Sequence, residues 1–329
     1  MAKQTKKRLP SLPSLLDRKI YKTGQTRGAD DDEIFQNRVS RNGTVLIPYS
    51  VVKQVFASLP KGESFEKGYI VLISPKQYFE NKNIAIELKQ LDLSLGVNLL
   101  IFYEVREDWN LYSPDAKGLS PATSRTQPLG GEFVARIPAT TSTGNGQKIA
   151  LGFHTTKPKG AGIRFYEYAT EKMTTDCRIQ LETLFWLCYD SKNVSLANGM
   201  TEENSNLRRE SILGIATANG LLDYKKLISS RIIDREHKTI CPLCLEKLSS
   251  TGFFNKMEQA EGREVSDLTI TQLNLFHINE LRLGELNHTT YNLGWGHHHC
   301  NVVVKDAGII PTLEWMDKVV KKNKESGYL

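Results

Sequence analysis

Two short motifs in the C-terminal third of the chain contain residues that bind metals. Cys241-Pro-Leu-Cys244 places two thiols close together directly after an apolar residue, and His297 and Cys300 repeat the same spacing downstream. A tight turn with this spacing lets both thiolates bind one tetrahedral Zn²⁺ at about 2.3 Å, and a structural site has four such ligands. The sequence therefore predicts a structural zinc site formed by Cys241, Cys244, His297 and Cys300. The alternatives are a redox pair or free thiols.

Three further polar residues, separated by fifteen and then nine positions, lie between and beside these motifs. His277 follows an apolar run, so we expect it at the end of a strand. Asn292 lies fifteen residues further along, and Asn301 lies nine beyond that, directly after Cys300 and before a short helical stretch. The other nearby histidines have no assigned role, and we expect them on the surface: His288, His298 and His299.

The segments CPLC, LFHINEL and YNLGWGHHHCN together resemble the HNH nucleases, also called ββα-metal nucleases, over about 70 residues. The resemblance implies that His277 is a general base, that Asn292 orients the loop through backbone hydrogen bonds, and that Asn301 is a ligand of one Mg²⁺. A neutral histidine can deprotonate water near pH 7. A divalent cation takes up charge on the phosphate and on the departing 3′ oxygen. The zinc would hold both ends of the loop in place.

The chain departs from this family at two positions. The residue before the catalytic histidine is usually an acidic residue or a histidine that binds the metal, whereas Phe276 cannot bind one. The final histidine of the motif is replaced by Asn301, which is a weaker ligand. The ion is then expected to use Glu280, Glu285 or Asp306, or more water. The alternative is an inactive domain.

The composition is that of a globular protein. The 329 residues are 40% hydrophobic and 24% charged, which excludes a disordered or low-complexity chain and allows two or three domains. No apolar run approaches the roughly 20 residues needed to span a bilayer, and the N-terminus lacks the apolar stretch of a secretory signal. Five scattered cysteines do not make a disulfide framework. These features favour a soluble, cytoplasmic protein.

Positive charge is concentrated at the N-terminus. Residues 1–28 carry eight Lys or Arg side chains and one acidic residue, so their net charge of +7 exceeds the +6 of the whole chain. A mobile basic arm of this kind suits a polyanion such as nucleic acid. The alternative is a tail that only increases solubility.

The hydrophobic pattern predicts an α+β protein: a β-rich and helical N-terminal region followed by a zinc-stabilised ββα-metal module. Period-two or short apolar runs predict strands at 44–49, 68–74, 83–88, 98–105, 132–137 and 149–154. Apolar spacing predicts helices at 171–190, 206–217 and 221–233, with a C-cap and turn at Asn219-Gly220. The expected domains are an arm at 1–28, a DNA-recognition and dimerisation region at 29–235, a nuclease domain at 236–312 and a helical tail at 313–329.

The chain as a whole, including LPSLLDRKIYKTGQTRGADDD, is similar to restriction endonucleases of the BstXI type. The similarity implies a homodimer on double-stranded DNA with a split palindromic site, in which each subunit cuts one strand. The base order depends on which side chains reach the major groove. Candidates in polar loops are Arg38, Arg41, Asn42 and Arg125; the alternative for each is solvated surface.

Other readings of the sequence remain open. A non-catalytic, zinc-containing DNA-binding protein is favoured by Phe276, and a modified-base-dependent or nicking HNH endonuclease is a second alternative. Glu87-Leu-Lys89, in a strand-like run, matches half of the PD-(D/E)-x-K nuclease signature, but no convincing aspartate precedes it at 60–80. Cys177 and Cys188 lie in an apolar helical pattern and are expected to be buried packing residues.

Overall fold

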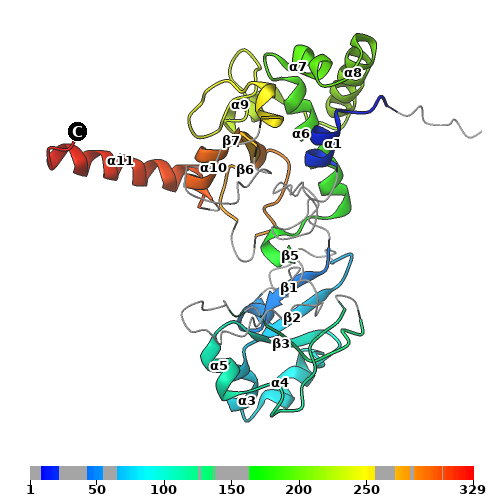
Figure 1. The fold of residues 1–329 in the computed structure, drawn as a ribbon, viewed down its shortest axis with the longest axis vertical. Coiled ribbons are helices and arrows are strands. Elements are labelled where there is room, and N and C mark those ends of the chain that lie inside the picture. Colours follow the sequence, from blue (N-terminus) through cyan, green and yellow to red (C-terminus); the bar gives the residue numbers. More distant parts are fainter. Residues whose placement is uncertain are drawn as a thin grey trace, which may run out of the picture. The chain divides into compact units, whose positions relative to one another are not determined.

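The structure is a computed structural model that describes residues 9–21, 43–54, 65–124, 127–135, 137, 163–255, 271–281, 285–305 and 307–329. The chain divides into two compact units (Figure 1). Unit 1 comprises residues 1–41, 171–282 and 287–329, and unit 2 comprises residues 42–170 and 283–286. No helix in the described ranges is long and apolar enough to cross a membrane. The expected division into an arm, a recognition region, a nuclease domain and a tail remains a prediction. The two compact units are defined by contacts between residues, which do not assign a function to any segment.

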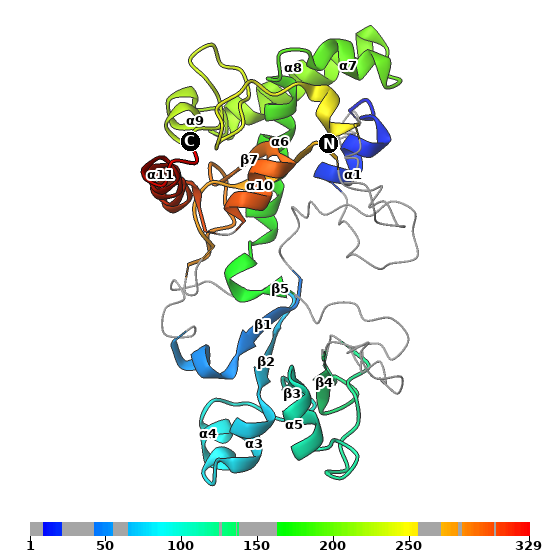
Figure 2. The same cartoon turned by 60° about the vertical axis from the view of Figure 1, so that its left-hand side comes forward.

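Unit 2 is built on a five-stranded parallel sheet with the strand order β4-β3-β2-β1-β5 (Figure 2). The register places Val45 beside Tyr69 and Ile101 beside Phe133. Parallel sheets are usually covered on both faces, which explains why their strands are almost continuously apolar. The strands are β1 (Val45–Pro48), β2 (Tyr69–Ile73), β3 (Leu99–Tyr103), β4 (Phe133–Ala135) and β5 (Ile163–Arg164).

The two faces of this sheet contribute to separate apolar clusters. Ile101 lies in the larger cluster, whereas its neighbour Leu100 lies in the smaller one, as expected when successive side chains of a strand point to opposite faces.

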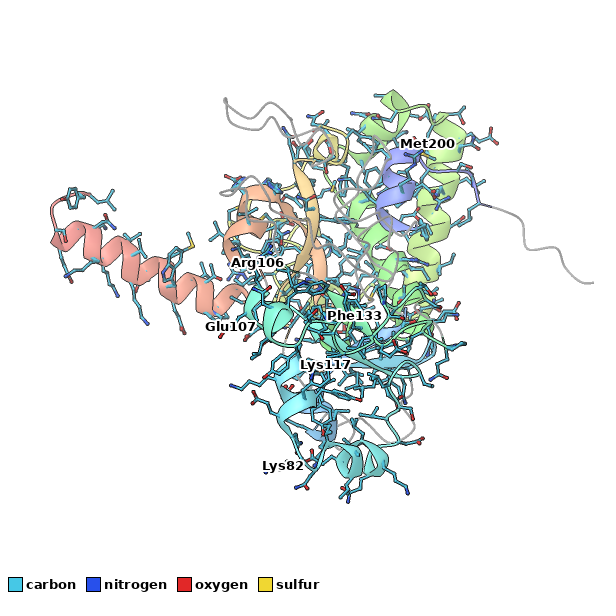
Figure 3. All side chains as sticks on the ribbon, turned by 60° about the horizontal axis from the view of Figure 1, so that its bottom comes forward. Lys82, Arg106, Glu107, Lys117, Phe133 and Met200 are labelled. Carbon is cyan, nitrogen blue, oxygen red and sulfur yellow. The ribbon has the colours of Figure 1, made fainter. Side chains whose placement is uncertain are left out.

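Arg106 and Glu107 mark the first turn of α5 in Figure 3. The helical elements of unit 2 are η1 (Tyr49–Val51), α3 (Pro75–Glu80), α4 (Ile84–Gln90), α5 (Arg106–Leu111) and η2 (Phe165–Glu167).

The predicted strands at 44–49, 68–74, 98–105 and 132–137 are confirmed as β1 to β4. The run at 149–154 lies outside the described residues. The strand at 83–88 is wrong, because this segment is helix α4. Alternation of Ile84, Ile86 and Leu88 resembles a strand, but Ile86 is exposed and Leu88 is buried. Ile84 and Leu88 are four residues apart, so they share one face of a helix.

Unit 1 is organised around α6 (Glu171–Trp186), whose C-terminal half is buried among the other elements. The prediction of a buried helix at 171–190 is therefore confirmed. The helical pair is confirmed as α8 (Glu202–Ala218) and α9 (Tyr224–Ser229), and Gly220 after α8 has a φ of +68°. The remaining elements are α1 (Ser14–Ile20), α7 (Ser191–Ala197), η3 (Ser250–Phe253), β6 (Leu273–His277), β7 (Leu293–His297), α10 (His298–Val304) and α11 (Ile309–Glu325).

The predicted N-terminal arm needs a correction over residues 9–21. Leu12, Leu16 and Ile20 are buried in the core of unit 1, so this stretch is a packed element rather than a mobile arm. These apolar side chains lie on one face of the segment, and their burial removes apolar surface from water. This stabilisation fixes the segment in the core despite the basic residues around it. Residues 1–8 and 22–28 lie outside the described part of the chain.

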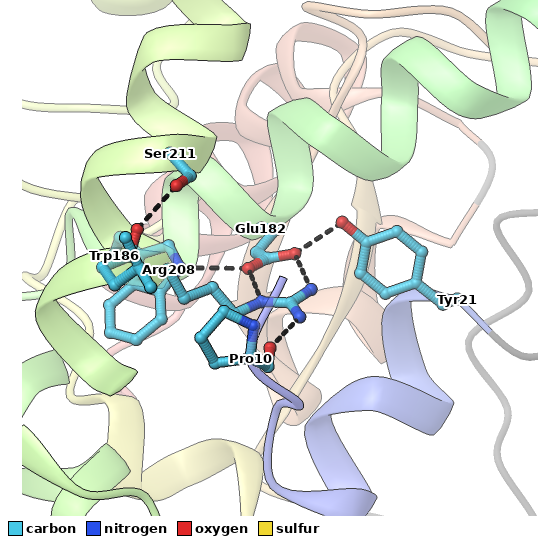
Figure 4. A network of polar contacts seen from close by, with 7 residues as sticks. Pro10, Tyr21, Glu182, Trp186, Arg208 and Ser211 are labelled. Carbon is cyan, nitrogen blue, oxygen red and sulfur yellow. Dashed lines mark hydrogen bonds and ion pairs between the residues drawn. The ribbon is translucent and has the colours of Figure 1, made fainter. Parts of the chain in front are cut away.

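A buried ion pair fastens this N-terminal segment to α6 and α8 (Figure 4). The carboxylate of Glu182 is fully buried and accepts hydrogen bonds from Nε of Arg208 at 2.6 Å and from Nη2 at 2.8 Å. Tyr21 donates to the same carboxylate, and Arg208 also donates to the carbonyl of Pro10. A buried charge needs this degree of pairing, since an unpaired one is strongly destabilising.

Lys19 joins the same segment to the start of β6. Its side chain is 2% exposed, and Nζ donates to the carbonyl of Leu273 at 2.9 Å and to the hydroxyl of Thr271. Burial disfavours the charged form and lowers the pKa of Lys19 from 10.5 to about 7. One of the basic residues expected to face a polyanion is therefore inside the protein.

We expect Lys19→Met to raise the free energy of unfolding more at pH 6 than at pH 9.5. The unfolded chain binds a proton on Lys19 below about pH 10.5 and the folded chain only below about pH 7, so stability falls as the pH drops through this window. The slope is at most about 1.4 kcal/mol per pH unit. Denaturant unfolding at several pH values measures it. The control is Lys225→Met on the exposed face of α9; equal pH profiles for the two variants would contradict the expectation.

Candidate active site

A β-hairpin followed directly by a helix carries most of the predicted site residues. Strands β6 and β7 are antiparallel, with Leu273 opposite His297 and His277 opposite Leu293. Helix α10 begins where β7 ends and packs against both strands (Figure 2). Two strands and a helix therefore form one small strand–strand–helix unit within unit 1, and residues 278–292 connect β6 to β7.

The four predicted zinc ligands lie together at one end of this unit. Cys241 and Cys244 belong to a tight turn in which the N–H of Leu245 donates to the carbonyl of Cys241 at 2.9 Å. His297 ends β7, and Cys300 lies in the first turn of α10. The ligand atoms of all four residues lie within 4.8 Å of one another, and Sγ of Cys244 is 3.3 Å from Nδ1 of His297.

This cluster fits Zn²⁺. Ligand atoms on a tetrahedral zinc ion are about 3.3 to 3.8 Å apart, given bond lengths of about 2.0 to 2.3 Å. Burial and the neighbouring thiols of Cys241 and Cys244 raise the pKa of Cys300, because a second negative charge is unfavourable there. A divalent cation removes that penalty. Within the described ranges, this is the one group of three or more His, Cys, Asp or Glu side chains placed to hold a metal ion.

His277, the last residue of β6, lies beside a second histidine. Its Nε2 is 3.1 Å from Nδ1 of His288, and the ring centroids are 5.4 Å apart. His277 is partly exposed, whereas His288 is 0% exposed. The expectation that His288 is a surface residue is therefore wrong. Its polar sequence neighbours conceal the burial.

Asn292 ties the two ends of that connection together. Its Oδ1 accepts a hydrogen bond from the N–H of Asn279 at 2.7 Å, and its Nδ2 donates to the carbonyl of Asn287 at 2.8 Å. The backbone carbonyl of Asn292 also accepts from Ile278 at 3.0 Å. A buried amide with these partners is costly to remove, because each backbone group would lose its partner.

Asn301 and Phe276 occupy different environments. Asn301 is partly exposed on α10, the helix that packs against β6. Phe276 is fully buried, and its ring lies so close to Gly296 that a Cβ there would be 2.4 Å from Cδ2 of Phe276. Phe276 therefore has a packing role in this chain. Asp306 lies outside the described residues.

The remaining polar candidates near the hairpin have separate surroundings. Nδ1 of His298 is 2.7 Å from Nδ2 of Asn274. His299 is exposed, as expected, and its ring stacks on that of His297 with centroids 5.3 Å apart. Glu285 is exposed and Glu280 is partly buried. None of these carboxylates forms a metal cluster with other described residues.

The alternative nuclease centre at Glu87 and Lys89 is wrong. These residues lie on helix α4 rather than on a strand, and residues two apart on a helix do not face each other. Glu87 instead accepts hydrogen bonds from Tyr49 at 2.7 Å and Asn81 at 3.1 Å, which lower its pKa. The Glu87 carboxylate therefore holds neighbouring side chains in place rather than forming part of a catalytic centre.

Two further cysteines are buried, as predicted: one within α6 and one just after its C-terminal end. Cys177 and Cys188 are 0% and 2% exposed, and burial raises the pKa of Cys177 to about 12. They are packing residues rather than reactive thiols. The four predicted base readers, Arg38, Arg41, Asn42 and Arg125, lie outside the described residues.

Comparison with protein families places the chain among the restriction endonucleases, which hydrolyse DNA at defined sequences. The model of the BstXI restriction endonuclease family matches residues 18–298, most of both compact units, and the chain belongs to this family. It is therefore a site-specific deoxyribonuclease whose substrate is DNA. Searches of curated proteins and of solved structures give no match.

We expect the purified protein to contain one zinc ion per chain. Cys241→Ser should abolish zinc binding and destabilise unit 1, because the free energy of metal binding contributes to folding. Elemental analysis and thermal unfolding measure both effects. Cys177→Ala is the matched control, since it removes a thiol outside the cluster and should retain the zinc. Wild-type protein without zinc but with normal stability would contradict the prediction.

Proposed function

We propose that this restriction endonuclease cuts double-stranded DNA with an HNH-type site, in which His277 is the general base and one divalent ion assists. Family membership supports the substrate and the site specificity. The observation that carries the proposal is the position of His277, at the end of a strand in a strand–strand–helix unit. The junction of β7 and α10 in this unit provides two of the four residues of the Cys3His cluster.

The proposed reaction is the hydrolysis of a phosphodiester bond. Partly exposed, His277 is accessible to a water molecule at the end of β6. The imidazole accepts a proton from this water as the water oxygen attacks phosphorus, and the bond to the 3′ oxygen breaks. A positioned general base of this kind contributes about 10²- to 10⁴-fold to the rate.

Asn292 acts on the backbone in this proposal. Its hydrogen bonds to Asn279 and Asn287 hold these two residues of the connection together beside His277. The substrate need not contact its side chain. The proposed zinc has a similar supporting role, since it joins the turn at Cys241 to the end of β7 and the start of α10.

Asn301 is the proposed protein ligand of Mg²⁺. The described residues form no carboxylate cluster for this ion, so water and DNA phosphates would supply most of the other ligands, as is common for Mg²⁺. When bound, such an ion would stabilise negative charge on the phosphate and the leaving oxygen. Glu280, Glu285 and Asp306 remain candidates for a second protein ligand.

We expect His277→Ala to bind the cognate DNA almost as well as wild type but to cut it about 10²- to 10⁴-fold more slowly. Asn301→Ala should also cut slowly and should be partly rescued by more Mg²⁺ or by Mn²⁺. Asn292→Ala should fall between these variants and wild type. Single-turnover cleavage and a binding assay separate the effects, with the exposed His237→Ala as control. A His277→Ala enzyme with the wild-type rate would exclude this site.

The alternative from the sequence is a zinc-containing DNA-binding protein without catalytic activity, which would mean that this member of the restriction endonuclease family has lost its activity. The buried Phe276 favours it, because this position lacks a metal ligand. Digestion of a plasmid with Mg²⁺ distinguishes the alternatives: discrete double-strand fragments support the restriction enzyme, and no cleavage supports the binding protein. Nicks alone or cleavage of modified DNA alone would indicate the other HNH alternatives.

Sequence readout is proposed for Arg38, Arg41, Asn42 and Arg125. A side chain that contacts a base should, when replaced by alanine, relax the preference at one position of the site, whereas loss of a phosphate contact weakens binding on all sequences. Binding to the cognate duplex and to single-base variants of it distinguishes these roles from solvated surface.

The proposed enzyme acts as a homodimer. Each chain has one proposed active site and cuts one strand, so two copies are needed to cut both strands of the duplex. Helix α11 (Figure 1) offers a surface for this contact. Four of its apolar residues are exposed and lie on one side of a helix with 3.6 residues per turn: Trp315, Met316, Val319 and Val320. The ion pair between Lys321 and Asp317 lies outside this apolar stripe. A two-fold axis at the middle of the stripe would place Met316 against Val319 of the second copy.

We expect the wild-type protein to sediment as a dimer and Val319→Glu to shift it toward the monomer, since a charge would be buried in the apolar contact. Glu314→Lys, a charge change on the opposite side of α11, should leave the dimer intact. Analytical ultracentrifugation over a range of concentrations measures both. A monomeric wild-type protein would contradict the homodimer, and a dimeric Val319→Glu protein would exclude α11 as its interface.

A further inference from the structure

We propose that His288 is a positioning residue that sets the tautomer and orientation of His277. The inference rests on the proposed function of His277 as the general base. It is carried by the distance of 3.1 Å between Nε2 of His277 and Nδ1 of His288, and by the complete burial of the His288 side chain.

The contact between the two rings allows two arrangements of the hydrogen atom. A neutral imidazole has one nitrogen that donates and one that accepts. If Nε2 of His277 donates to Nδ1 of His288, then Nδ1 of His277 is the nitrogen that carries a lone pair. If His288 donates instead, the lone pair of Nε2 is used in the contact and Nδ1 of His277 carries a hydrogen. Only the first arrangement leaves His277 able to accept a proton from water.

The arrangement needed for catalysis requires a neutral His288 with a lone pair on Nδ1. Complete burial disfavours the cationic form of an imidazole, and in its neutral form His288 can offer Nδ1 as an acceptor. When His277 takes up a proton, both of its nitrogens become donors, and the hydrogen bond from Nε2 to His288 persists without reorganisation. The same logic applies to a carboxylate that orients a catalytic histidine in hydrolases, although a neutral acceptor is weaker.

Hydrogen bonds hold the backbone on either side of His288. The N–H of Thr289 donates to the carbonyl of Asn287 at 3.0 Å, and the N–H of Asn292 donates to the carbonyl of Thr289 at 3.2 Å. Asn292 also holds Asn287 through its side chain. The same asparagine that orders the connection thus holds His288 in place.

The test compares variants that keep or remove an acceptor at Nδ1. His288→Asn places Oδ1 near the position of Nδ1, whereas the longer side chain of His288→Gln places its amide further out, and His288→Leu has no acceptor. We expect single-turnover cleavage by the Leu and Gln variants of the full chain to be about 10- to 10²-fold slower, the range typical of supporting residues around a reactive group. The Asn variant should recover most of this loss. Binding of cognate DNA and zinc content should be unchanged.

A double variant separates positioning from a structural role. If His288 acts through His277, then His288→Leu should cause no further loss in a His277→Ala background, since the two effects are not additive. The exposed His237→Leu is the control for loss of an imidazole. Wild-type rates for both His288→Leu and His288→Gln, equal loss in the Asn and Gln variants, or a full additional loss in the double variant would overturn the inference. A His277→Ala enzyme with the wild-type rate would instead overturn the proposed function.

Discussion

One buried amide fixes the candidate active-site loop to the core of unit 1. Gln180 on α6 is 1% exposed, donates through Nε2 to the carbonyl of Leu221 at 2.9 Å, and accepts through Oε1 from the N–H of Tyr291 at 2.8 Å. Trp295 on β7 adds a hydrogen bond to the carbonyl of Leu181 at 2.9 Å. Apolar packing alone is not directional, whereas these contacts specify the position of the hairpin along α6.

Three independent restraints then act on the residue proposed as the base. The strand pair fixes the backbone of His277, the side chain of Asn292 closes the connection that follows it, and His288 contacts the ring itself. The Cys3His cluster lies at the far end of β7 and the start of α10, where the proposed zinc would join them to the turn at Cys241. Precise placement of a reactive group usually requires such supporting contacts, because an error of about 1 Å lowers the rate substantially.

The sequence predicts much of this arrangement because ligand spacing and strand ends are local features. Cys241 to Cys300 could be grouped from two short motifs, and His277 could be placed at a strand end from its apolar neighbours. Burial caused by distant segments could not be predicted: His288 lies in a polar stretch, and Lys19 lies among basic residues, yet both are inside unit 1. Helix α4 was misread because three alternating apolar residues fit two periodicities until their exposure is known.

The close contact between Phe276 and Gly296 links the evolution of two positions. A side chain at 296 has no room while the phenylalanine ring is present, and Gly296 directly precedes His297, one of the four proposed zinc ligands. An exchange of Phe276 for a smaller acidic residue would leave a void that a methyl group on residue 296 could partly fill. Ancestors or relatives that bind metal through the position of Phe276 should therefore carry a larger residue at that of Gly296. The two positions should covary, and engineering a stronger ion site here calls for a paired exchange.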